Sequence, residues 1–348
     1  LGASPIARPP RQWERASYRK ILALTTGQQR RAAYLRCSVS ASKKVSILLA
    51  SRHSTRMHIP PFASLDAFQA GGMHALRQGP VALLLVEDTA EVAATLDHLA
   101  HCGFRRTIAF LPEDIALPAH PTEPVRVTMN TRRPDALADA VNAALSAAPP
   151  GIWLHACYNA EFLMFPFSEH RSVGELLAFH AEEKRDAMLT FVIDLYAADL
   201  SQAPNGIDRA APHFDRLGYY ALSRLNPARH NHPNDRQLDF FGGLRWRFEE
   251  HVDDTSRRID RVSLFRARPQ LRMSPDNTFN APEYNTYACQ WHNNLTATLC
   301  SFRAAKALLT NPLSREAIQT FLWQGSEPFN WSSRQLMDLG LMEPGQWF

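Results

Sequence analysis

The chain has 348 residues, of which 45% are hydrophobic and 21% are charged, a balance typical of globular proteins and unlike that of disordered ones. Its longest apolar runs, such as Val81–Val86, are far shorter than the roughly 20 residues of a membrane-spanning helix. The sequence therefore predicts a soluble protein without a transmembrane segment. Its five cysteines form no C-x-x-C pair, which indicates reduced thiols in an intracellular compartment.

Charge is distributed unevenly along the chain. Residues 1–65 contain twelve Lys or Arg and one Glu, a net charge of +11, so the remaining residues carry +4 minus +11, or −7. Such a basic arm can contact an acidic protein, anionic lipid or nucleic-acid phosphate, and charge alone does not choose among them. The arm also resembles a targeting segment for mitochondria or another organelle, because it is rich in Arg and Ser and nearly free of acids. An organellar and a cytoplasmic location both stay open.

From Pro80 onward, short apolar runs alternate with amphipathic segments. This pattern predicts strands at 81–86, 107–111, 125–129, 152–157 and 188–195, and helices at 91–101, 134–147 and 173–181. Gly103 is expected to end the first of these helices as a C-cap. Strands that alternate with helices at this spacing predict an α/β fold with a mostly parallel central sheet, covered by helices on both faces.

The rest of the chain gives weaker signals. Residues 200–290 contain Pro, Asn and Asp clusters with little periodicity, so a long irregular segment is expected there. Short helices are expected around Ala317–Trp323 and Ser333–Leu339. The predicted organisation is a basic N-terminal arm, an α/β domain and a helical C-terminal extension, with bounds at 1–79, 80–312 and 313–348.

Acidic residues follow the first two predicted strands. Glu87 and Asp88 come directly after the first strand, and Asp114 follows the second. Because ligands of parallel sheets bind beyond the carboxyl ends of the strands, these three carboxylates are candidates for contacting a nucleotide. The alternative is structural: Asp88 caps the next helix, and Asp114 lies in an ordinary Pro-containing turn.

One stretch carries a family resemblance. Residues 153–163, WLHACYNAEFL, resemble the part of family-2 glycosyltransferases in which a buried strand runs into an Asp-x-Asp-Glu-Phe-Leu motif. Later segments resemble further elements of that family in the same order, namely Phe191–Tyr196, Gly242–Arg245, Arg261–Leu264 and Leu299–Arg303. The resemblance implies a GT-A fold, which is an α/β sandwich that binds nucleotide-diphospho-sugars.

The chain departs from that family at the metal-binding positions. The resemblance implies that two Asp and a late His hold Mg²⁺ or Mn²⁺ against the sugar nucleotide in active members, whereas this chain has Tyr158, Ala160 and Ser301 there. A phenol, a methyl group and a hydroxyl are poor replacements for these ligands of a hard cation. Glu161 is the carboxylate that remains. It is a weak catalytic candidate, and a structural role in hydrogen bonds or an ion pair with Arg is the favoured interpretation.

Basic side chains can also stabilise a diphosphate without a metal. Arg245, Arg247 and Arg303 are the candidates for phosphate binding. The first two alternate as they would on one face of a strand, so ion pairs on an exposed edge strand are the alternative. His230 and His232 lie in a Pro- and Asn-rich stretch without further ligands at zinc spacing, so no metal site is expected.

The favoured functional interpretation is a pseudoenzyme. In this view the protein is glycosyltransferase-like, has no cofactor and serves as an accessory or structural subunit of a larger, possibly mitochondrial, protein assembly. One alternative is an active glycosyltransferase that transfers sugar from a nucleotide sugar, either without a metal or with Mg²⁺ or Mn²⁺. A second alternative is a nucleic-acid-associated protein that binds through its basic arm.

Overall fold

The structure, a computed structural model, describes residues 59–286 and 294–347. Most of the predicted basic arm lies outside the described residues, so the predictions made for it are not addressed by the fold. Within the described ranges, no helix is long and apolar enough to span a membrane.

The α/β unit begins earlier than the sequence indicated. The chain divides after His58, and Ile59 is the first residue of the large unit, so residues 59–79 belong to the α/β unit rather than to the arm. The reason is apolar packing. Helices α2 (Leu65–Gly71) and α3 (Met73–Leu76) bury Phe68 and Leu76 completely in the core beside the central sheet.

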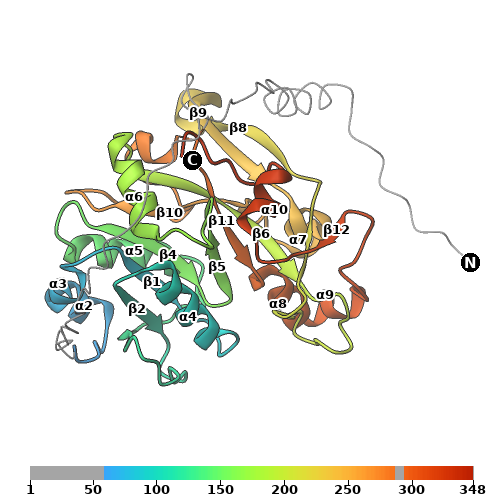
Figure 1. The fold of residues 1–348 in the computed structure, drawn as a ribbon, viewed down its shortest axis with the longest axis horizontal. Coiled ribbons are helices and arrows are strands. Elements are labelled where there is room, and N and C mark those ends of the chain that lie inside the picture. Colours follow the sequence, from blue (N-terminus) through green and yellow to red (C-terminus); the bar gives the residue numbers. More distant parts are fainter. Residues whose placement is uncertain (1–58, 287–293, 348) are drawn as a thin grey trace, which may run out of the picture. The chain divides into compact units, whose positions relative to one another are not determined.

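A large mixed sheet forms the centre of the unit (Figure 1). Its strands are β1 (Val81–Leu85), β2 (Arg106–Leu111), β3 (Val125–Thr128), β4 (Trp153–Tyr158), β5 (Glu161–Met164), β6 (Ala187–Tyr196), β7 (His213–Asp215), β10 (Asp260–Arg266), β11 (Ala297–Ser301) and β12 (Ser326–Pro328). The main path runs β12-β7-β6-β10-β4-β1-β2-β3, and β11 pairs with β6 and β5. Strands β3, β2, β1 and β4 are parallel neighbours, while β10 runs antiparallel between β4 and β6.

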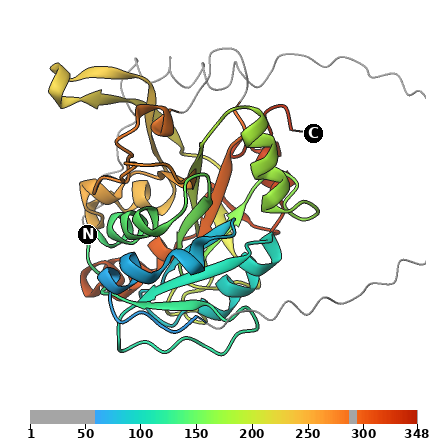
Figure 2. The same cartoon turned by 90° about the vertical axis from the view of Figure 1, so that its left-hand side faces the viewer.

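Helices cover both faces of this sheet, as the alternation of strands and helices predicted (Figures 1 and 2). The remaining helices are α4 (Val92–Cys102), α5 (Ala136–Ala147), α6 (Val173–Glu182), α7 (Gly243–Arg247), α8 (Arg303–Thr310), α9 (Pro312–Ala317) and α10 (Ser333–Asp338). Helix α5 packs with α2 and α3 on the face that holds Leu83 and Leu85, and α4 and α6 pack on the face that holds Ala82 and Leu84. Every residue of β1 is buried because helices flank both faces.

The predicted elements of the first half are confirmed within one or two residues at most ends. Gly103 is in the left-handed conformation (φ 94°) and its N–H bonds to the carbonyls of Leu99 and Ala100, so it ends α4 as predicted. The left-handed region costs glycine little because it has no Cβ, which explains why the helix stops there.

The segment expected to be irregular, residues 200–290, is more ordered than the sequence indicated. It supplies β7, α7, the central strand β10, and a two-stranded ribbon formed by β8 (Tyr220–Asn226) and β9 (His232–Phe241). The ribbon projects from the body (Figures 1 and 2). Polar alternation hid it, because a ribbon that is mostly exposed has no buried face to mark its strands.

The C-terminal part differs from the predicted helical extension. Helix α9 occupies 312–317 instead of 317–323: Asn311 caps its N-terminus, Pro312 is its first residue, and Ile318 leaves the helix in an extended conformation. The helix expected around 333–339 is confirmed as α10. Strand β12 extends the central sheet beside β7, and Trp347 packs against Phe165 and other aromatic rings of the core. This segment is therefore part of the α/β unit.

Candidate functional site

The strand order creates a topological switch point between β1 and β4, which is the place where the chain reverses the direction in which it adds strands to the sheet. From β1 the chain moves outward to β2 and β3 and then crosses back to β4 on the other side of β1. Crevices at the carboxyl ends of two such strands are the usual ligand sites of doubly wound sheets. Glu87 and Asp88 follow β1, and Asn159 follows β4, so the switch point brings two of the predicted acids together.

Asn159 holds the two loops together. Its side chain is fully buried; the amide oxygen accepts a hydrogen bond from the Glu87 N–H (2.9 Å), and the amide nitrogen donates to Asp88 Oδ1 and to the Ala90 carbonyl (2.8 Å each). The Asp88 carboxylate also accepts the Ala90 N–H (2.9 Å), although Asp88 is not the N-cap of α4, which is Glu91. Sequence reasoning missed Asn159, whose only signal was its place directly after a predicted strand.

Helix α8 supplies two cations to this pair of acids. Arg303 binds both carboxylate oxygens of Glu87, with distances of 2.8 Å from Nε and 2.7 Å from the terminal nitrogen. One turn later, the Lys306 ammonium lies 2.6 Å from Asp88 Oδ2. Burial opposes the charge of Asp88, but Lys306 and the hydrogen bonds to the carboxylate outweigh it, so the pKa of Asp88 is lowered. Sequence reasoning missed Lys306. The available signal was that Lys306 follows Arg303 by three residues, a spacing that places both side chains on the same face of a helix.

Tyr158 lies beneath Arg303. The guanidinium carbon of Arg303 is 3.9 Å from the centre of the Tyr158 ring, and that of Arg261 is 5.6 Å from it. Such short cation–π contacts are favourable and also occupy space. The ring is 5% exposed, and burial raises the pKa of the Tyr158 phenol. At this position, where the resemblance implies that active members have a metal ligand, the Tyr158 ring instead contacts two guanidinium groups.

Glu161 is held by the groups around it. Its Oε2 accepts the Tyr158 N–H (2.8 Å) and forms a buried ion pair with Arg261, and its Oε1 accepts the Ser301 hydroxyl (3.3 Å). Burial alone would raise the pKa of Glu161. Arg261 and the Tyr158 N–H lower this pKa by a larger amount, so the net shift is downward. The carboxylate is charged and fully engaged, which matches the structural role that the sequence favoured.

Ala160 and Ser301 complete the three positions at which the family resemblance implies metal ligands. Ala160 has φ 62°; its N–H donates to Thr95 Oγ1 and its carbonyl accepts the Phe302 N–H (3.0 Å each). Ser301 faces Glu161 across the β11–β5 ladder. The structure therefore brings Tyr158, Ala160 and Ser301 together around the carboxylate of Glu161.

This set of side chains does not fit a divalent cation. The one carboxylate among them is paired with Arg261, and the Arg303 guanidinium lies on the Tyr158 ring, so a cation would meet two positive charges and a single, occupied acid. In the part of the chain that the structure describes, no three His, Cys, Asp or Glu side chains are grouped as metal ligands.

Asp114 lies at the edge of the same site. It pairs with Arg132 (2.9 Å), whose Nε also donates to the Glu87 carbonyl (2.9 Å). Both side chains of this ion pair are largely exposed, so the pair adds little stability. The three acids predicted for nucleotide contact are thus neighbours, and each of them is already paired with a basic residue.

Arg245 and Arg247 do not reach the switch point, and their predicted strand is wrong. They lie on α7, which begins at Gly243, and the positive φ angles of Gly242 and Gly243 turn the chain into this helix. Arg245 lies 3.4 Å from Asp194. Of the three basic candidates, Arg303 alone lies at the switch point.

A buried carboxylate on β7 binds Arg247. The Nε of Arg247 lies 2.8 Å from Asp215 Oδ2. The other oxygen, Asp215 Oδ1, accepts hydrogen bonds from the Tyr196 hydroxyl (2.5 Å) and the Trp323 indole (2.7 Å). The guanidinium is also within 5.5 Å of the ring centres of Tyr196 and Trp323. A cation enclosed in this way is a structural element rather than a free phosphate ligand.

No protein-family model matches this sequence, and a search of curated proteins finds none that is significantly similar to it.

Proposed function

We propose that this protein is a non-catalytic, glycosyltransferase-like subunit of a larger protein assembly, with a GT-A-like fold. The observation that carries the proposal is that the basic side chains at the switch point are neutralised by acidic side chains of the protein itself. Arg303 and Lys306, the two cations that a diphosphate would need at this site, are already bound by Glu87 and Asp88. A nucleotide diphosphate would have to displace the carboxylates of Glu87 and Asp88 from these cations, and both carboxylates would remain close to it because they are part of the same chain.

The energetics support this reading. A two-point contact between Arg and a carboxylate is among the stronger pairs in proteins, and the tethered carboxylate loses little freedom when it binds. A diphosphate ligand must instead lose translational freedom, and it would meet the displaced charges of Glu87 and Asp88 at short range. Glu161 adds a third negative charge that is already paired with Arg261.

The arrangement of strands is compatible with the GT-A fold that the family resemblance implies. Four parallel strands, β3-β2-β1-β4, form one half of the sheet, as in Rossmann-like sandwiches, and the segments that resemble the family lie on β4–β5, β6, α7, β10 and β11. The basic stretch at 1–65, with its net charge of +11, supports attachment to an acidic partner in an assembly, mitochondrial or in another compartment.

Calorimetric titration tests the proposal. Full-length protein titrated with uridine and guanosine diphosphates, with and without Mn²⁺, is expected to release no binding heat. The double variant Glu87→Gln/Asp88→Asn keeps the shapes of both side chains but frees Arg303 and Lys306, so it is expected to gain diphosphate affinity. Micromolar binding by the unaltered protein, followed by sugar transfer, would contradict the proposal.

The presence of Arg303 and Lys306 at the switch point favours one other candidate, a metal-independent glycosyltransferase. In that case the two cations would leave their carboxylates and stabilise the leaving diphosphate. The same titration separates the candidates, because an enzyme must bind its donor nucleotide without Mn²⁺, and a UDP-sugar or GDP-sugar would be consumed in the presence of an acceptor.

A further inference from the structure

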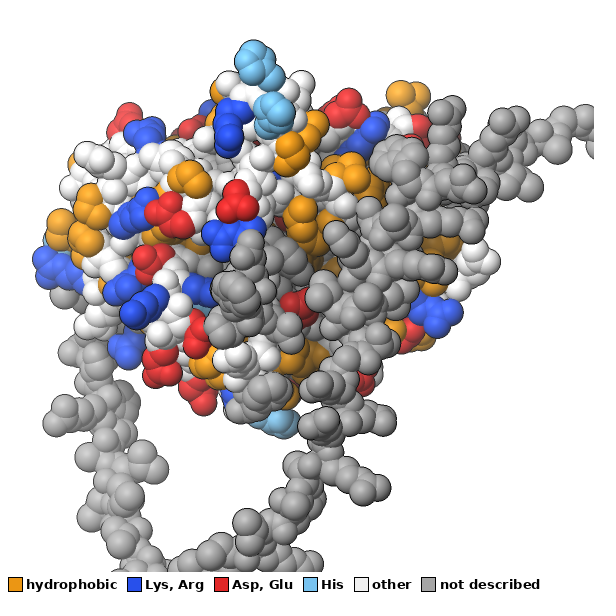
Figure 3. Space-filling view, turned by 90° about the horizontal axis from the view of Figure 1, so that it is seen from above, with side chains coloured by type: hydrophobic (Ala, Val, Ile, Leu, Met, Phe, Trp, Pro, Cys, Tyr) orange, Lys and Arg blue, Asp and Glu red, His pale blue; other side chains and the backbone are white. Residues whose placement is uncertain are grey.

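The charge pattern on the β8–β9 ribbon differs from that of the rest of the described surface. On the face seen in Figure 3, acidic and basic side chains are interspersed. The outer part of the ribbon is different, since residues 225–234 contain no Asp or Glu but include Arg229, His230 and His232, all exposed. Arg236 is exposed as well, with Asp235 as its neighbouring acid (3.3 Å).

The tip is fixed by its own hydrogen bonds. The Asn226 carboxamide accepts the Ala228 N–H and donates to Asn234 Oδ1 (3.0 Å each), and the Asn226 carbonyl accepts the Asn231 N–H (2.9 Å). His230 and Asn231 both have positive φ, 52° and 59°. His and Asn are among the non-glycine residues that adopt this region most readily, so the sequence suits the turn.

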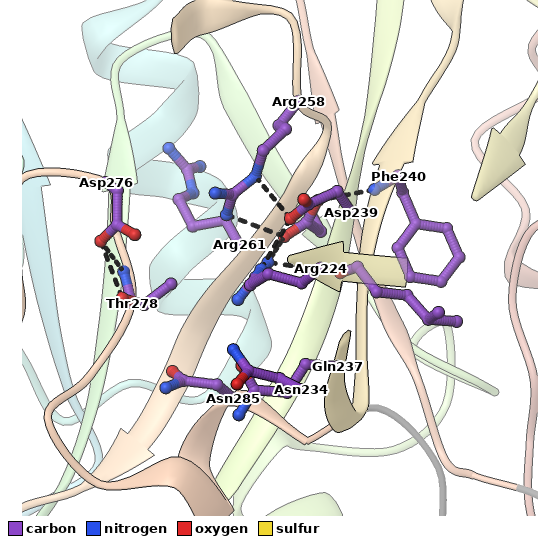
Figure 4. A network of polar contacts seen from close by, with 12 residues as sticks. Arg224, Asn234, Gln237, Asp239, Phe240, Arg258, Arg261, Asp276, Thr278 and Asn285 are labelled. Atoms are coloured by element: carbon purple, nitrogen blue, oxygen red, sulfur yellow. Dashed lines mark hydrogen bonds and ion pairs between the residues drawn. The ribbon is translucent and has the colours of Figure 1, made fainter. Parts of the chain in front are cut away.

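The base of the ribbon is clamped to the body (Figure 4). Arg224 on β8 pairs with Asp239 on β9 (2.6 Å) and with Asp260 on β10 (2.7 Å), and Arg258 pairs with Asp260 (3.0 Å). Asp260 is almost completely buried, and the charges of this network are matched. A rigid base and a fixed tip mean that little freedom is lost when the ribbon binds a partner.

We propose that the β8–β9 ribbon inserts its basic tip into a groove of a double-stranded nucleic acid, with Arg229 and Arg236 contacting phosphates. Phosphate complements a tip made of cations and amide donors, and the sparse aromatic content argues for backbone contacts rather than base stacking. This site is distinct from the predicted arm and does not depend on the pseudoenzyme proposal.

The dimensions agree with this partner. Beyond the Leu222–Asp239 pair at the clamped base, β8 continues for four residues to Asn226, so at about 3.3 Å per residue the ribbon extends by roughly 13 Å. The major groove of B-DNA is about 12 Å wide and about 8.5 Å deep and admits a two-stranded β-ribbon, whereas that of A-form RNA is deep and narrow. The exposed side chain of Leu225 (53%), which lies beyond the base, would then be on the flank of the ribbon, where it can contact sugars.

Salt dependence of binding tests the proposal. Full-length protein is titrated into fluorescent 24-base-pair duplexes of DNA and of RNA, so that the two sources of a phosphate groove are separated. The variant Arg229→Gln/Arg236→Gln is compared with Arg77→Gln/Arg334→Gln, which removes the same charge from exposed sites elsewhere. Loss of two phosphate contacts is expected to lower the slope of log affinity against log salt by about 2 for the ribbon variant.

A second measurement locates the contact. A photo-crosslinking amino acid at position 231 is expected to attach to the duplex, whereas the same group at exposed Gln202 is not. Equal slope changes in the ribbon and control variants, with no crosslink from position 231, would overturn the proposal. So would ribbon-dependent binding to phosphatidylglycerol vesicles without binding to either duplex. Unchanged thermal unfolding of both variants shows that the comparison concerns binding and not folding.

Discussion

Asp194 is a carboxyl group whose burial is poorly compensated. It lies on β6 with its side chain fully buried, and Arg245 approaches it only to 3.4 Å. Gly243 is packed so closely that an added Cβ would lie 2.9 Å from Asp194 Oδ2. Burial raises the pKa of Asp194 to about 6, although Arg245 opposes the shift. The charged form is therefore costly in the folded state.

This shift predicts an unusual pH dependence. Because the folded pKa is above the usual value of 3.8, protonation stabilises the fold, and this contribution fades as the pH rises through about 6. The variant Asp194→Asn should lack it. The free energy of unfolding, measured with urea, should rise in the unaltered protein relative to the variant by on the order of 1–3 kcal/mol between pH 7 and pH 5. A difference that is constant with pH would contradict the assignment.

The buried pair of Arg261 and Glu161 gives a second prediction at this scale. The variant Arg261→Met leaves an unpaired buried carboxylate and should destabilise the protein by about 3–5 kcal/mol. The double variant Arg261→Met/Glu161→Gln removes both charges and should recover part of that loss. Thermal and urea unfolding of the four proteins of this cycle measure the coupling. Additive effects would mean that the two side chains do not act as a pair.

At the scale of a single element, the C-cap of α4 can be tested. Gly103 has φ 94°, and an added Cβ would meet Ser172 Cβ at 3.5 Å, an ordinary contact. The cost of Gly103→Ala is thus conformational and should be about 1 kcal/mol of unfolding free energy. Gly103→Asn should cost less because Asn tolerates the left-handed region better. Equal losses would indicate a steric origin instead.

At the scale of the whole molecule, the boundary at residue 59 predicts the behaviour of two fragments. Residues 59–348 should unfold at nearly the same temperature as the full chain, because they hold the large compact unit. Residues 80–348 lack Phe68 and Leu76, which are fully buried, so they should be less stable by several kcal/mol or should not fold. Similar unfolding temperatures for the two fragments would place the boundary near residue 80.

The shorter stable fragment also separates the two nucleic-acid hypotheses. Residues 59–348 lack almost all of the basic arm but keep the β8–β9 ribbon. Binding through the arm should disappear in this fragment, whereas a contact made by the ribbon should persist with a weaker salt dependence.

The sequence by itself determined the alternation of strands and helices between Val81 and Tyr196, because those segments are buried and their apolar periodicity follows the element they form. It also indicated Glu87, Asp88, Glu161 and Arg303 as site residues. Only the tertiary structure decided their partners. Lys306 and Asn159 reach the acids across long sequence distances, and α7 turns Arg245 and Arg247 toward buried acids. Pairing between residues distant in the chain depends on strand order and register, which local periodicity does not encode.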